Sequence, residues 1–285
     1  MISSNSAQDR AAERYTRPAS RFPDVFPGVA KPLIAMAHVP ALPGTPLYDA
    51  AEGIGGLVRH VQQDVAALVA AGFDAVMFCN ENDRPYTLKA DMVASAVMAR
   101  VVTECIPDAV PFGVDYLWDA ECALAVAVAT EARFLREVAT GVWESDMGLW
   151  APDAAGLLRR RRAFDADRVA VLMNVTPEFA SSVGHRSPAD IAKTVATSSL
   201  PDAILVSGPM AGAQPDASVV AQVRQAVPDG IPVLLNTGAR ADNIAGFLEV
   251  ADGCIVGSGL KVDGYTWNRV DPARAEAFVR AARGG

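Results

Sequence analysis

The fold is decided by two adjoining segments, IPVLLNTGARADNIAGFLEV at residues 231–250 and ADGCIVGSGLKVDG at residues 251–264. In both, a short apolar stretch runs into a turn that contains glycine, and across the chain such units continue into an alanine-rich helical stretch. Strands that alternate with helices in this way form parallel sheets, because the helix carries the chain back to the starting edge.

The same unit occurs eight times along the chain. Each apolar run is nearly continuous, as expected for a strand covered on both faces. The predicted strands are residues 32–38, 74–80, 110–116, 132–138, 168–175, 202–208, 232–238 and 253–259. We therefore expect an α/β fold, a (β/α)8 TIM barrel at residues 31–285 that forms a single domain with an N-terminal arm at residues 1–30. A doubly wound open sheet would need GxGxxG after an early strand, and the first strand ends in HVPALPG instead.

Bulk composition narrows the class of protein. The chain of 285 residues suits one barrel, since such domains have roughly 250 residues. No apolar run approaches the roughly 20 residues that span a bilayer, and the first 30 residues lack the apolar stretch of a secretory signal. We expect a cytoplasmic protein with no membrane span.

Charge and cysteine usage exclude further classes. The net charge of -8 and pI of about 4.9 make nucleic acid an improbable partner. Cys79, Cys105, Cys122 and Cys254 form no CxxC pair and sit among apolar neighbours, as reduced core thiols do. No P-loop, HExxH or GxSxG motif is present, and no metal site is predicted. The sequence does not identify a cofactor, and it leaves two alternatives open: no cofactor, or a divalent metal.

Catalytic groups of a TIM barrel come from the C-terminal ends of its strands. The catalytic candidates there are His38, Asp115, Arg136 and Asn174, and the substrate-binding candidates are Asn80, Asp83, Glu137, Ser207 and Asn236. An imidazole can transfer protons near neutral pH, a carboxylate can act as its partner, and a guanidinium can bind an anion. The alternative for each is structural: a hydrogen-bonded histidine, a salt bridge across the mouth, or an amide that serves a neighbouring loop.

The loops after the last two strands predict an anion site. Glycine lets the backbone approach an anion closely, so several amides there can point at one phosphate. The phosphate-binding candidates are Gly238, Ala239, Gly257, Ser258, Gly259 and Lys261. The alternative is that these glycines only form tight turns.

One connection is long for a barrel of this type. Residues 139–152 follow the fourth strand and contain Trp143 and Trp150. Loops of this length are commonly lids or interface elements. Exposed aromatic side chains would suit an interface with a partner.

Four segments together resemble the BtpA/SgcQ family: IAMAHVPALPGTPLYD, AGFDAVMFCNENDRPY, RFLREVATGVWESDMG and ADGCIVGSGLKVDGYTWNRVDPAR. The resemblance covers nearly everything from residue 31 onward and implies a TIM barrel of the ribulose-phosphate-binding type. It also implies sugar-catabolic enzymes in some members and a link to photosystem I biogenesis in the name-giving branch. Residues that fall on family motif positions are His38, Asn80, Asp83, Arg136, Asp146, Gly257 and Lys261, and Asp146 joins the substrate-binding candidates on this ground.

The chain departs from the family pattern at three places. Cys79 stands where the family usually has Glu, Trp118 and Asp119 replace an Arg-Asn pair, and Glu178 and Phe179 occupy what is typically Lys-His. Asp115 and Glu137 are possible replacement carboxylates.

Three functions follow from these patterns. The leading one is an enzyme with lyase-like or isomerase-like acid/base chemistry on a small phosphorylated sugar or nucleotide-derived metabolite. The second is a non-catalytic assembly or regulatory factor that binds a partner through the tryptophan loop. The third is a metal-dependent hydrolase with a metal on His38, Asp115 and Glu137. We also expect a homo-oligomer, a dimer.

Overall fold

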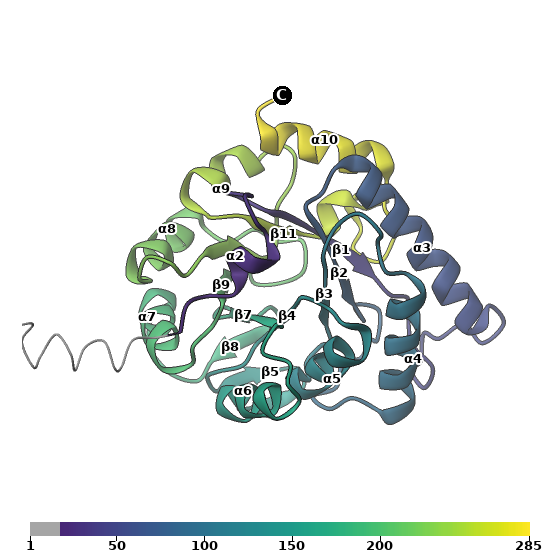
Figure 1. Cartoon of the computed structure of the whole chain (residues 1–285), viewed down its shortest axis with the longest axis horizontal. Coiled ribbons are helices and arrows are strands. Elements are labelled where there is room, and N and C mark those ends of the chain that lie inside the picture. Colours follow the sequence, from purple (N-terminus) through teal and green to yellow (C-terminus); the bar gives the residue numbers. More distant parts are fainter. Residues whose placement is uncertain (1–17) are drawn as a thin grey trace, which may run out of the picture.

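A computed structural model describes residues 18–285, which fold into one closed barrel of eight parallel strands surrounded by helices (Figure 1). This confirms the predicted TIM barrel. Around the barrel the strands follow the order β1-β11-β10-β9-β7-β4-β3-β2. They are β1 (Leu33–His38), β2 (Ala75–Cys79), β3 (Phe112–Asp115), β4 (Phe134–Glu137), β7 (Ala170–Asn174), β9 (Ala203–Val206), β10 (Val233–Leu235) and β11 (Cys254–Val256). Expectations for residues 1–17 of the arm lie outside the described residues.

The helices that cover the barrel mostly begin at a side chain that caps them. The capping residues Asp91, Asp119, Asp153, Ser187 and Asp216 each accept a hydrogen bond from a backbone N–H of the first turn. The helices are α3 (Gly53–Ala71), α4 (Met92–Glu104), α5 (Ala120–Thr130), α6 (Ala154–Ala163), α7 (Pro188–Ser198), α8 (Ala217–Ala226), α9 (Ile244–Val250) and α10 (Pro272–Arg283), with short 3-10 helices η1 (Ser258–Leu260) and η2 (Val262–Gly264).

A short helix, α2 (Phe22–Val25), closes the N-terminal end of the barrel and overlies its centre in Figure 1. Phe26 packs on Phe134 at the start of β4, with ring centroids 5.8 Å apart. Gly113 on β3 lies so close to the Phe134 ring that a Cβ there would overlap it. Small and large side chains thus alternate inside the barrel, and the described part of the arm plugs the end opposite the strand C-termini.

Parallel register brings the ends of the strands to one edge. His38 is level with Cys79, and Cys79 is level with Asp115. The candidate side chains at the strand ends therefore come from neighbouring strands at the same rim of the barrel, where TIM barrels hold their sites.

The connection at 139–152 is a hairpin of β5 (Trp143–Ser145) and β6 (Gly148–Trp150), extended by β8 (Ala180–Ser182) into a three-stranded sheet. Trp143 is only 3% exposed and Trp150 only 8%. The expectation that these tryptophans are exposed is therefore wrong. Both rings belong to the same apolar cluster as the side chains inside the barrel.

Candidate active site

A pocket opens at the C-terminal ends of the barrel strands. Its cavity volume is about 40 Å³, whereas one water molecule needs about 10–15 Å³ by the same measure. The pocket therefore holds a group larger than one water. Eight of the residues predicted from the sequence line it: His38, Arg136, Asn236, Gly238, Ala239, Gly257, Ser258 and Gly259.

The loops after β10 and β11 form one wall of the pocket because glycines let them pack closely. A Cβ on Gly259 would lie 2.5 Å from the Ala239 carbonyl oxygen. Gly238 has φ of +76°, and a Cβ there would overlap the backbone of Gln214 in the loop after β9. Since real Cβ atoms do not approach so closely, only glycine fits at these two positions.

Backbone amides in this wall have no acceptor among residues 18–285. The N–H groups of Gly238, Ala239, Gly257, Ser258 and Gly259 donate to no protein oxygen in the structure. Ser258 and Gly259 are the first residues of η1, where the geometry of a helix leaves amides without partners. The five residues that carry these amides belong to two adjacent loops, and all of them line the pocket.

His38 contributes an imidazole from the end of β1. Its Nδ1 lies 3.0 Å from the carbonyl oxygen of Thr266, which can only accept, so we assign the proton to Nδ1 and leave Nε2 with a lone pair. Nε2 lies beside Gly257, where a Cβ would come within 3.0 Å of it. Burial, and then the charge of Lys261, hold the pKa of His38 well below its usual value. The ring is therefore a neutral hydrogen-bond acceptor facing the pocket.

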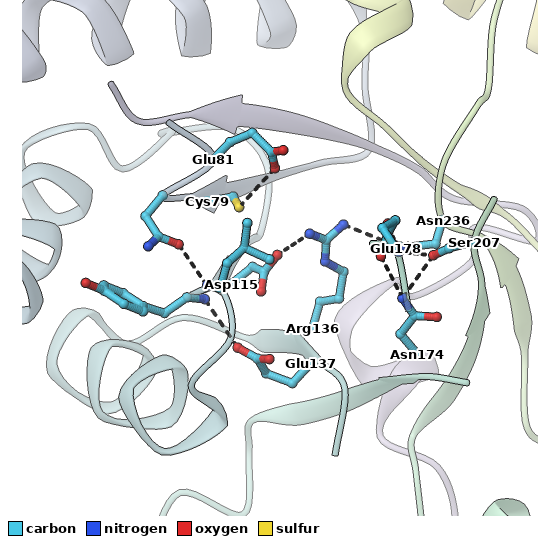
Figure 2. Close-up of polar contacts among 12 residues, drawn as sticks. Cys79, Glu81, Asp115, Arg136, Glu137, Asn174, Glu178, Ser207 and Asn236 are labelled. Carbon is cyan, nitrogen blue, oxygen red and sulfur yellow. Dashed lines mark hydrogen bonds and ion pairs between the residues drawn. The ribbon is translucent and has the colours of Figure 1, made fainter. Parts of the chain in front are cut away.

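Arg136 lies at the centre of a group of buried acids (Figure 2). It forms an ion pair with Asp115 and donates to Asn236 Oδ1 at 3.2 Å. Burial raises the pKa of Asp115, and the guanidinium of Arg136 opposes the rise. Asp115 is 1% exposed and does not line the pocket; its carboxylate contacts Arg136 instead.

Glu81, in the loop after β2, is a pocket residue that the sequence reasoning missed. Its carboxyl group accepts from Cys79 Sγ at 3.6 Å and from the Tyr86 hydroxyl at 3.3 Å. The Trp267 indole donates to its backbone oxygen at 3.1 Å. Burial is the main cause that raises the pKa of Glu81 to about 7. A carboxyl with such a pKa can both give and take a proton at neutral pH.

Glu178, after β7, was noted in the sequence only as a departure from the family pattern. Its two carboxyl oxygens accept from Asn174 at 3.1 Å and from Asn236 at 3.3 Å. Both amides also donate to Ser207 Oγ, at 2.9 and 2.8 Å. Asn174 and Ser207, predicted as pocket residues, therefore lie behind Glu178 and fix its position (Figure 2).

Asn80 and Asp83 are brought together beside the pocket, not in its lining. The Asn80 amide donates to Asp83 at 2.9 Å and accepts from the Leu117 amide at 2.8 Å, while Asp83 accepts from the Leu42 amide at 2.7 Å. Glu137 is buried and accepts from the Tyr116 amide at 3.4 Å. These side chains order the loops after β1, β2 and β3 that frame the site.

Two predicted site residues lie elsewhere. Lys261 is fully buried, and its Nζ donates to Asp64 on α3 at 3.1 Å. It does not line the pocket, and its charge is paired with Asp64 inside the helical layer. Asp146 is exposed at the tip of the β5–β6 hairpin and does not line the pocket.

Some lining residues escaped the sequence reasoning because nothing in the local pattern marks them. Polar residues occupy positions 80 to 83 without a break, and the sequence does not say which of them faces the pocket. Trp118 and Phe179 follow β3 and β7 and read as ordinary loop aromatics. The pocket residues that were not among the predicted site residues are Glu81, Leu117, Trp118, Glu178, Phe179, Ala211, Gly212, Thr237, Thr266 and Met36.

The side chains expected to bind a metal in a hydrolase, His38, Asp115 and Glu137, do not form a metal site in residues 18–285. Within residues 18–285, no three His, Cys, Asp or Glu side chains are placed so that they could share a metal ion. His38 Nδ1 is used by Thr266, and Asp115 is used by Arg136. The hydrolase hypothesis therefore has no ligand set in the part of the chain that the structure describes.

Comparison with known proteins places the chain among relatives along nearly its whole length. The putative sgc region protein SgcQ of Escherichia coli (strain K12) is 39% identical over 253 residues, which are 88% of this chain and 94% of that protein. The photosystem I biogenesis protein BtpA of Synechocystis sp. is 31% identical over 258 residues, 89% of this chain and 88% of that protein.

Among solved structures, monomers generated from the dimeric phosphoribosylanthranilate isomerase of Thermotoga maritima share the fold, with a TM-score of 0.55. That match has 15% identity and covers 90% of this chain and 100% of the other. Every helix in residues 18–285 is too short or too polar to cross a membrane. The model of the BtpA family matches residues 29–284. On this match and these relatives, the chain belongs to the BtpA family.

Proposed function

We propose that this protein is an enzyme that moves a proton on a small phosphorylated metabolite, in lyase or isomerase chemistry next to a carbonyl group. The observation that carries the proposal is the meeting, in one pocket, of five unpartnered backbone amides with a neutral imidazole, a carboxyl group of raised pKa and a guanidinium. Anion binding by backbone amides is a recurrent use of the last two loops of a TIM barrel.

Each group then has a distinct task. The amides of Gly238, Ala239 and residues 257–259 hold the phosphate. Glu81, with a pKa of about 7, takes a proton from the substrate and returns it at another atom. His38, whose low pKa keeps it neutral, accepts a hydrogen bond from the substrate at its free Nε2. Arg136, supported by Asp115 and Asn236, stabilises the negative oxygen that develops at the carbonyl.

Binding of inorganic phosphate tests the phosphate part of the proposal. Gly257→Val places a branched side chain against His38 Nε2 and fills the space beside the amides, so calorimetry at pH 7 should detect phosphate binding to the wild type and none to this variant. Gly257→Ala, with a Cβ at 3.0 Å from Nε2, should weaken it in part.

Gly246→Val is the matched control, because Gly246 on α9 has open space around it. It should bind phosphate like the wild type. Equal phosphate affinity in folded Gly257→Val and Gly246→Val would show that the amides do not form the site.

A second candidate is a non-catalytic assembly factor, which the name of the Synechocystis relative favours. Since Trp143 and Trp150 are buried, a partner would instead meet the exposed Val142, Leu149 and Val183 of the small sheet. Leu149→Lys should then abolish capture of the partner in a pull-down. If capture is unchanged, this surface is not the contact.

Cytoplasmic location and a homodimer belong to the same proposal. Dimeric enzymes occur among proteins of this fold. Light scattering on the full chain should give twice the mass of 29.9 kDa, and a mass of one chain would contradict the dimer.

A further inference from the structure

The pocket has two unlike walls. One wall consists of the loops after β10 and β11, which contain the amides described above. The other wall is apolar: the loops after β3 and β7 contribute Leu117, Trp118 and Phe179, and β1 contributes Met36. Sugar hydroxyls need hydrogen-bonding partners, and these side chains offer almost none. The second wall therefore does not match a bare sugar phosphate.

The aromatic side chains of this wall are fixed by further rings. Trp118 meets Trp150 edge-on, with centroids 5.7 Å apart, and meets Tyr86 at 6.2 Å. Tyr86 also contacts Phe179 at 6.1 Å. Aromatic pairs at such distances and tilts attract one another beyond the area that they bury. The wall is thus preorganised, with little side-chain entropy left to lose when a ligand binds.

Phe179 is held by its backbone as well. It has φ of +56°, in the left-handed region that bulky residues rarely adopt. Its amide donates to the carbonyl oxygen of Pro209 at 3.0 Å. The ring is only half-buried although the backbone around it is constrained. A half-exposed ring at the edge of a polar pocket is where a ligand finds an apolar surface.

We infer that the phosphorylated substrate carries a planar aromatic or heteroaromatic group, which packs against Trp118 and Phe179 while its phosphate meets the amides of the opposite loops. This inference rests on the proposed function and narrows its substrate class. The polar groups His38, Glu81 and Arg136 line the same pocket, so the reacting atoms belong to the part of the substrate that links ring and phosphate.

Three probes separate what the phosphate, an apolar group and a planar ring each contribute to binding. They are inorganic phosphate, cyclohexyl phosphate and phenyl phosphate. The last two have similar size and the same charge, but only phenyl phosphate has a planar aromatic ring. Because aromatic contacts add stabilisation beyond burial, phenyl phosphate should bind the full chain roughly two- to tenfold more tightly than cyclohexyl phosphate in calorimetry.

Phe179→Leu keeps an apolar side chain of similar reach and removes the ring, so the ratio of the two affinities should fall toward one. Phe164→Leu is the control, since Phe164 is 50% exposed at the end of α6 and outside the pocket. Trp118→Phe, which keeps a ring at the buried position, should retain a preference for phenyl phosphate.

The outcomes distinguish this inference from the proposed function. If inorganic phosphate binds and Gly257→Val abolishes it, but phenyl and cyclohexyl phosphate bind equally well, the phosphate site stands and the aromatic wall is not a ligand surface. If the preference for phenyl phosphate survives Phe179→Leu, the ring sits elsewhere and the inference fails. If no phosphate binds at all, the proposed function fails and the inference falls with it.

Discussion

Arg136 is the residue on which the charge balance of the site depends. Asp115, Glu81 and Glu178 lie near enough for its charge to counter the rise that burial imposes on each of their pKa values. Taking several acids out of water costs free energy unless a cation compensates them. One guanidinium does not offset burial for all of these carboxyl groups: the pKa of each stays raised, and that of Glu81 reaches about 7. A pKa near neutral suits acid catalysis.

The stability of the protein should report the protonation of Glu81. Its folded-state pKa of about 7 exceeds the ordinary 4.5, so between these values the folded state binds more protons than the unfolded state. The free energy of unfolding therefore falls as pH rises from about 4.5 to 7. Glu81→Gln should remove this part of the slope. Above pH 7 its free energy of unfolding should exceed that of the wild type by up to about a few kcal/mol.

Urea unfolding at pH 5, 6, 7 and 8 measures that slope. Glu144→Gln removes a carboxyl group from the exposed side of the small sheet and serves as the control. Parallel stability curves for the wild type and Glu81→Gln would mean that Glu81 is ionised in the folded protein, and its role as proton donor would be lost.

At the scale of the element, the sequence predicts strands better than it predicts what their loops do. Eight apolar runs identify eight parallel strands because a strand buried on both faces has a continuous apolar composition. Trp143 and Trp150 gave no such signal, because they lie in a connection that reads as a loop but forms a hairpin. Their burial goes with contacts to distant segments: β5 pairs with β8, and Trp150 packs against Trp118. Contacts between distant loops are absent from local patterns.

Packing between neighbouring strands makes a sharper prediction. In β3, a Cβ on Gly113 would overlap the ring of Phe134 in β4, so Gly113→Ala should lower the free energy of unfolding by about 1–3 kcal/mol. Adding Phe134→Leu should restore part of the loss, because the smaller side chain leaves room for the methyl group. Gly246→Ala on α9 is the matched control and should not be destabilised.

Denaturant unfolding of the single and double variants gives the coupling between the two positions. A double variant whose loss equals the sum of the separate losses would mean that Gly113 and Phe134 do not share the space that the structure assigns to them.

At the scale of the whole molecule, the beginning and the end of the barrel are tied together by a buried ion pair. Lys261 follows η1, and its partner Asp64 lies on α3, 197 residues earlier. Asp64 also accepts from the amide of Val270 at 3.0 Å. In the sequence, the position of Lys261 after the last strand suggested a phosphate ligand. The sequence alone does not distinguish a lysine that faces the pocket from one that turns outward to a helix.

The buried pair predicts how Lys261 variants behave. Lys261→Met leaves the Asp64 carboxylate buried without its cation, which should lower the free energy of unfolding by about 3–5 kcal/mol. Asp64→Asn combined with Lys261→Met should recover part of this, because a neutral amide oxygen can still accept from Val270. Urea unfolding measures the stability of the single and the double variant. Calorimetry with inorganic phosphate measures whether each still binds the anion. If Lys261→Met were as stable as the wild type but failed to bind phosphate, Lys261 would be a phosphate ligand after all, and the loop after β11 would have to rearrange when the anion binds.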